Sequence, residues 1–116
     1  MPVVAEYNAR RVSERDRTGK VLWDYPLSRS PLEVQRLANG NTLIATNYEI
    51  LEVTRAKTVA FTFSDKGGNI FSAQKLANGH ILYGLYTGAV VELDRAGKVV
   101  WEKKFEGRRP WLARRR

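Results

Sequence analysis

The sequence contains no cysteine, which excludes disulfides, thiolate chemistry and cysteine-ligated metal sites. It contains a single histidine, His80, and this leaves too few ligands for a metal site, so we expect no metal. No apolar run approaches the roughly 20 residues that a membrane-spanning helix needs. The N-terminus lacks a basic start followed by an apolar stretch, so we expect no signal peptide in this chain. None of these absences indicates a cellular compartment.

The charge of the chain is positive and unevenly placed. The chain has 116 residues, a length typical of one domain, and carries a net charge of +8. Nucleic-acid binders usually interleave basic residues with exposed aromatics, but Trp111 is the only aromatic among residues 108–116. We therefore interpret this segment as a solvated basic end, with contact to nucleic acid, acidic lipid or an acidic protein as the alternative. Residues 108–116 contain five positive charges, which leaves a net charge of +3 for the rest of the chain. The five are Arg108, Arg109, Arg114, Arg115 and Arg116.

Two short motifs recur along the chain with a common period. Leu-Ala-Asn-Gly occurs at residues 37–40 and 76–79, which are 39 residues apart. Gly-Lys-Val-Leu-Trp at residues 19–23 returns as Gly-Lys-Val-Val-Trp at 97–101, two periods later, with a degenerate copy at 57–61 between them. A fixed period of this size indicates a repeat architecture, in which no unit buries its apolar face alone.

Each repeat unit reads as four short antiparallel strands joined by tight turns. The apolar alternation has period two, and no segment shows sustained helical periodicity. The pairs Asn39-Gly40 and Asn78-Gly79 predict type I′ hairpin turns, in which both central residues have positive φ. The expected strands are 3–7, 11–15 and 20–24, then 32–37, 42–46, 50–54 and 58–63, and finally 72–76, 80–85, 90–94 and 98–102.

Four-stranded units with a period near 40 residues are typical of β-propeller blades. Residues 15–23 and 93–101 resemble the Asp-x-x-(Thr)-Gly-Lys-x-x-Trp motif of PQQ-like (quinoprotein-type) propellers. Residues 37–43 are similar to a turn that is common in that superfamily, arylsulfotransferase-like propellers included. The resemblance implies that Trp23 and Trp101, with Phe61 as the middle substitute, dock against the neighbouring blade. It also implies structural roles for Gly19, Gly97, Asn39, Gly40, Asn78 and Gly79, and the superfamily is often extracytoplasmic.

The two ends of the chain match parts of one unit. Residues 107–115 align with residues 28–36 at a shift of 79, and their prolines coincide. We therefore expect one propeller segment, in which 1–24 form the last three strands of a blade, 31–63 and 72–102 form full blades, and 108–116 form the first strand of a shared blade. Three blades cannot close a ring, because about four to eight are typical, so we expect a six-bladed homodimer closed by strand exchange. The alternatives are a higher oligomer and a fragment of a longer propeller.

Three cations occupy equivalent first-strand positions. Arg36, Lys75 and Arg115 are spaced by the repeat, and six such cations in a dimer would form a ring at the central channel. Such a ring would attract an anionic ligand or an acidic partner. The alternative is that each cation pairs with an acidic neighbour or reaches solvent.

No catalytic residues are expected from the sequence. The recurrence of Glu14, Glu52 and Glu92 favours a blade-forming role over paired-carboxylate catalysis, and His80 reads as a polar residue flanking a turn. We expect a binding or scaffold module without a cofactor rather than an enzyme, because fold alone does not license an activity. The alternative is a quinoprotein-like or arylsulfotransferase-like enzyme.

Overall fold

The computed structural model describes residues 3–104, and within them it contains eleven strands and no helix. The prediction of an all-β fold is confirmed. Within this part no helix is long and apolar enough to cross a membrane. The strands are β1 (Val3–Glu6), β2 (Arg11–Arg15), β3 (Val21–Pro26), β4 (Glu33–Arg36), β5 (Thr42–Ala45), β6 (Glu49–Val53), β7 (Val59–Ser64), β8 (Ile70–Lys75), β9 (Ile81–Leu85), β10 (Ala89–Leu93) and β11 (Val99–Lys104).

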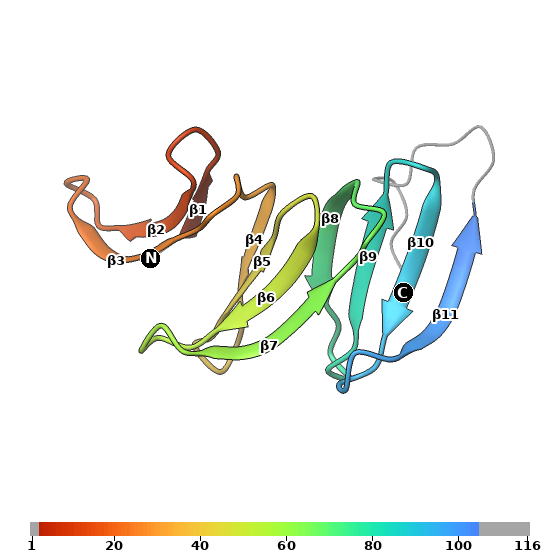
Figure 1. The fold of residues 1–116 in the computed structure, drawn as a ribbon. Helices are drawn as coiled ribbons and strands as arrows, with labels where there is room; N and C mark the ends of the chain where they lie inside the picture. Colours follow the sequence, from red (N-terminus) through yellow and green to blue (C-terminus); the bar gives the residue numbers. More distant parts are fainter. Residues whose placement is uncertain (1–2, 105–116) are drawn as a thin grey trace.

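The strands form three antiparallel sheets that follow one another along the chain. Blade 1 is β1-β2-β3, blade 2 is β4-β5-β6-β7, and blade 3 is β8-β9-β10-β11, each in sequential order. Figure 1 shows the three sheets side by side, from the red N-terminal sheet to the blue C-terminal one. The strand β8 packs against β4 and β5, and β4 packs against β1, so adjacent blades meet along the first described strand of each sheet. Blade 1 lacks, among the described strands, the first strand that the other two blades have.

The core lies in two seams, a seam being the contact between the faces of adjacent blades. Because successive side chains of a strand point to opposite faces, β5 supplies both seams. Ile44 packs with Val12 and Trp23 between blades 1 and 2. Leu43 packs with Ile81 between blades 2 and 3. All four residues of β5 are buried as a result, which is why this strand reads as a continuous β-branched and apolar run.

The Asn-Gly turns differ from the predicted type I′ geometry. The Gly40 N–H donates to the Leu37 carbonyl (3.0 Å), and only Gly40 has positive φ, at 91°. The turn is therefore a type I turn followed by a left-handed glycine, the common three-residue hairpin loop. The Asn39 side chain has a different role from the predicted one, because its Oδ1 accepts the Asn41 N–H (2.9 Å). The second turn is built in the same way, with Gly79 at φ 89°.

Candidate binding site between the blades

A buried glutamate stands opposite an aromatic residue in every blade. The register pairs Glu14 with Trp23, Glu52 with Phe61, and Glu92 with Trp101. The register shifts directly after each glutamate, because the paired strand β3, β7 or β11 has one extra residue there, a β-bulge. Bulges re-aim side chains and increase local twist, so the repeated bulge places each carboxylate at the same point of its blade. The glutamates are 7%, 6% and 4% exposed, and burial this deep requires partners.

Blade 2 supplies the partners of Glu14. Arg36 on β4 and Arg55 in the β6–β7 turn both donate to Glu14 Oε1, at 2.7 Å and 2.5 Å. The Trp23 indole Nε1 donates to the Arg55 carbonyl (2.8 Å). The Arg36 guanidinium also lies 5.3 Å from the centre of the Trp23 ring, within cation–π range. Trp23 therefore contacts the next blade both by packing and by a hydrogen bond to one turn of that blade.

Blade 3 supplies a cation to Glu52 in the same way. Lys75 on β8 donates through Nζ to Glu52 Oε1 (2.6 Å), and Asn41 donates through Nδ2 to Oε2 (2.7 Å). A methyl group built on Gly97 would lie 3.5 Å from the Phe61 ring. Phe61 therefore lies beside the β10–β11 turn of blade 3, as Trp23 lies beside the β6–β7 turn of blade 2.

These contacts set the ionisation of the carboxylates. Burial acts to raise the pKa of Glu14, but the Arg55 hydrogen bond and the charges of Arg55 and Arg36 outweigh it and hold that pKa below its usual value. Burial opposes ionisation of Glu52 likewise, and the hydrogen bonds from Lys75 and Asn41 hold its pKa below the usual value. Both seams thus contain a carboxylate that stays charged at neutral pH because the following blade provides a cation.

His80 has a role that its sequence position alone did not indicate. Its Nδ1 lies 2.7 Å from Glu92 Oε2, where Asn41 meets Glu52 in the preceding blade. The residue after each Asn-Gly turn therefore contacts the glutamate of its own blade. No group of three or more acidic, histidine or cysteine side chains among residues 3–104 is arranged to hold a metal ion.

The predicted cation positions border one cleft. Arg36 and Lys75 line a cleft of about 570 Å³ together with Arg95, Asn39 and Gly79. Arg36 and Lys75 each pair with a glutamate of the preceding blade, which is the alternative that the sequence left open. Arg115, the third predicted position, lies outside the described residues, as do the arginines and Trp111 of residues 108–116. Binding of an anion here remains a prediction.

Sequence reasoning missed three arginines that occupy one turn position. Arg17, Arg55 and Arg95 follow the first residue of the turn between the last two strands of each blade. Arg55 contacts Glu14, whereas Arg95 donates through Nε and Nη2 to the Asn78 carbonyl (3.2 and 3.0 Å) and lines a smaller cavity with Glu52. Their regular spacing in the sequence could have identified them.

Comparisons with known proteins support the fold and no finer assignment. No protein-family model matches the sequence, and no curated protein matches it. A protein of unknown function from Bacteroides caccae is similar in structure, with a TM-score of 0.69 and 22% identity over 90% of this chain and 45% of that one. The WD40 β-propeller domain of Doa1 has a TM-score of 0.77 and 13% identity, covering 92% of this chain and 37% of that one.

This chain spans less than half of the length of each of these two structures. Identities below 25% indicate the fold alone. The PQQ-like resemblance therefore stays a prediction, and what the described residues form is a set of β-propeller blades.

Proposed function

We propose that this chain is a non-enzymatic β-propeller scaffold that closes by pairing with a second copy of itself. The observation that carries the proposal is the edge of blade 1. In blades 2 and 3 the strands β5 and β9 are paired on both sides, whereas the equivalent strand β1 has only β2 as a neighbour among the described strands. An edge strand presents a row of backbone donors and acceptors that another strand can pair with.

Residues 108–116 are the segment that we assign to this edge. Their sequence matches the segment that contains β4, the strand that pairs with β5 in blade 2. Exchange of this segment between two copies would complete two shared blades and give a ring of six blades, which is within the usual range. If the three blades instead belong to a longer single-chain propeller, the edge of β1 pairs within that chain.

We assign anion binding to the cleft between the first-strand turns, with an acidic side chain or a small oxyanion as the ligand. Two of its cations, Arg36 and Lys75, are offset by Glu14 and Glu52, so the net positive charge of the cleft comes mainly from Arg95. In a closed dimer the cleft would recur around the channel. Each copy of the cleft would bind an anion weakly, and the copies together would bind a multivalent anionic partner more tightly.

The molar mass in solution tests the proposed assembly. Size-exclusion chromatography with light scattering is expected to give about twice the chain mass of 13.2 kDa. A folded monomer would exclude the self-assembling scaffold. Visible absorbance from a copurified quinone would support the enzymatic alternative instead.

Titration with inorganic phosphate, followed by backbone amide chemical shifts, tests the cleft. We expect shifts at residues 37–40 and 76–79 that are lost in Arg95→Gln and kept in the control Lys66→Gln, since Lys66 lies in the loop between blades 2 and 3 at the opposite rim. Equal shifts in both variants, or none in the parent protein, would contradict binding at this place.

A further inference from the structure

One face of blade 1 is polar where the matching faces of the other blades are apolar. The shared register of the three glutamates places Ser13 and Arg15 of β2 at the positions of Leu51 and Val53 in β6. The latter two are 8% and 0% exposed and pack on the preceding blade. Val91 and Leu93 take the same positions in blade 3 and are also buried against the preceding blade.

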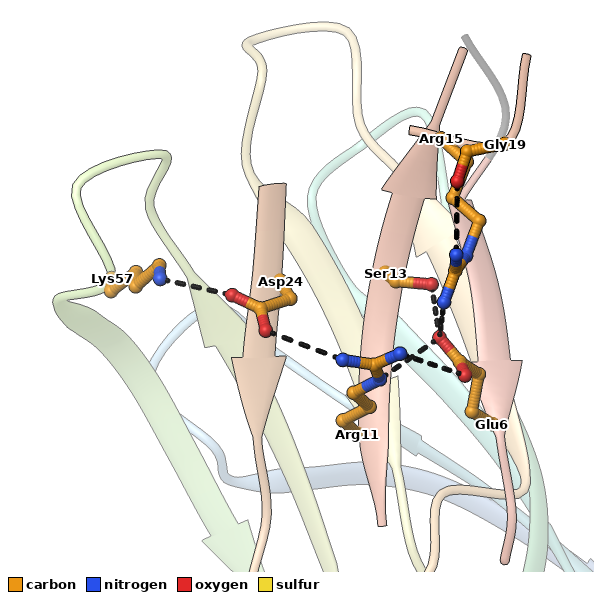
Figure 2. A network of polar contacts seen from close by, with 7 residues as sticks. All are labelled: Glu6, Arg11, Ser13, Arg15, Gly19, Asp24 and Lys57. Atoms are coloured by element: carbon orange, nitrogen blue, oxygen red, sulfur yellow. Dashed lines mark hydrogen bonds and ion pairs between the residues drawn. The ribbon is translucent and has the colours of Figure 1, made fainter. Parts of the chain in front are cut away.

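The polar face of blade 1 is held together by contacts between arginines and carboxylates. Glu6 accepts hydrogen bonds from Ser13 and from Arg11 (3.2 Å to Nε) and pairs with Arg15 at 3.5 Å, as Figure 2 shows. Arg15 also donates to the Gly19 carbonyl (3.0 Å) in the turn that contains Arg17. Arg11 also pairs with Asp24 (3.7 Å), so two arginines meet two carboxylates here, and Arg17 is exposed beside them. This face is therefore charged rather than apolar, and it is solvated at its margin, unlike an ordinary seam.

The far face of blade 3 repeats the pair of residues that receives the Arg55 turn inside the chain. The pair Glu92 and Trp101 corresponds to Glu14 and Trp23, which together receive the Arg55 turn of the next blade. Arg17 holds the position of Arg55 in its own turn. The contact made inside the chain by Glu14 and Arg55 is therefore encoded a second time, with its two halves at opposite ends of the row of blades.

We propose that the charged face of blade 1 docks on the Glu92–Trp101 face of blade 3 of a second copy, with the partner turn at Arg17 in the place that the Arg55 turn takes inside the chain. This inference rests on the proposed homodimer and adds its mechanism of closure. Because Ser13 and Arg15 replace the apolar side chains of the internal seams, and Arg11 lies beside them, the seam between copies is electrostatic. Assembly is then controlled by ionic strength while the blades within each chain stay packed.

The dimer dissociation constant, measured by sedimentation at two salt concentrations, tests this seam. We expect the constant of the parent protein to rise at least about tenfold between about 50 mM and about 500 mM NaCl, because screening weakens exposed charge pairs. Arg17→Glu places a like charge opposite Glu92 in both seams of a two-fold dimer. At low salt it should raise the dissociation constant roughly a hundredfold, about tenfold for each seam.

Two controls separate the seam from general charge effects. Arg95→Glu makes the same change at the equivalent turn inside the chain, and should lower the unfolding temperature while leaving the dissociation constant within about twofold. Lys66→Glu makes the same change in net charge at the opposite rim and should alter neither quantity. In a Glu92→Gln background, which keeps the side-chain shape, the effect of Arg17→Glu should fall below about tenfold.

The outcomes distinguish this seam from the proposed assembly. A parent protein that is monomeric at low salt would overturn both. A stable dimer whose dissociation constant ignores salt, or responds equally to Arg17→Glu and Arg95→Glu, would overturn the electrostatic seam and leave the dimer standing. An undiminished effect of Arg17→Glu in the Glu92→Gln background would show that Glu92 is not the group that Arg17 faces.

Discussion

Replacing Lys75 by methionine tests whether a buried charge pair joins blades 2 and 3. The change keeps the length of the side chain but removes the ammonium group that lies 2.6 Å from Glu52 Oε1. Breaking a buried pair from one side costs about 3–5 kcal/mol. The Lys75 side chain is 27% exposed and Asn41 still donates to Glu52, so we expect about 2–3 kcal/mol at neutral pH. For a domain of this size that corresponds to a fall of roughly 10–20 °C in unfolding temperature.

The pH dependence separates charge from packing in this variant. The pKa of Glu52 is lowered in the folded parent protein, so the pair stabilises the fold above the ordinary value of 4.5 and this contribution is lost as the pH falls through the folded pKa. In Lys75→Met the burial of Glu52 is no longer offset by the cation, and protonation relieves the penalty. Urea unfolding of both proteins at pH 7 and pH 4 should therefore show a smaller difference in free energy at pH 4.

The double variant Lys75→Met with Glu52→Gln is the control for this prediction. Removing both charges leaves no buried ion at this seam, and the free energy of unfolding should return to within about 1 kcal/mol of the parent value. An equal loss at both pH values, or no recovery in the double variant, would refute the reasoning and assign the effect of Lys75→Met to lost packing.

Two further substitutions test the turns and the aromatic positions. Trp23→Phe removes the hydrogen bond to the Arg55 carbonyl but keeps a ring, as Phe61 does in blade 2, and chemical denaturation should show a loss of about 1–2 kcal/mol; a loss above about 4 kcal/mol would mean that the ring packs differently from Phe61. Gly40→Ala places a side chain at a φ of 91° and should cost about 1–2 kcal/mol by thermal unfolding, whereas Gly67→Ala, which has no positive φ and meets only Asp65 Oδ1 at 3.4 Å, should cost less than about 0.5 kcal/mol. Equal losses for the two glycines would contradict the left-handed conformation of Gly40.

The strands of this protein could be predicted because each repeat carries its own alternation and turn residues. The strand β2 has the expected bounds, and β5 differs by one residue at its end. Turn geometry could not be predicted in the same way, because Asn-Gly is compatible with two hairpin types. The structure has a type I turn with Gly40 as the left-handed residue, and the preceding Asn39 caps the turn with its side chain.

The partners of the cations depended on information that one repeat does not contain. Arg36 and Lys75 were placed correctly as equivalent residues, but their contacts with Glu14 and Glu52 cross from one blade to the next. Sequence spacing alone does not give the distance between faces of adjacent blades. The polar face around Glu6 was missed for the same reason, since it is unusual only when β2 is compared with β6 in register.

The most direct test of the central claim is a cross-link between β1 and residues 108–116 in a protein that has no native cysteine. The register of β4 with β5 pairs Val34 with Ile44, and the repeat relates these residues to Ala113 and Val4. Alternation from the Leu37–Asn41 hydrogen bond makes Val34–Ile44 a non-hydrogen-bonded pair, whose side chains are close enough for a disulfide. The variant Val4→Cys/Ala113→Cys, oxidised and analysed by intact mass, should give a covalent dimer with 4–113 linkages. A chain that forms the 4–113 bond within itself, or forms it no faster than the off-register control Val4→Cys/Arg114→Cys, would contradict closure by strand exchange.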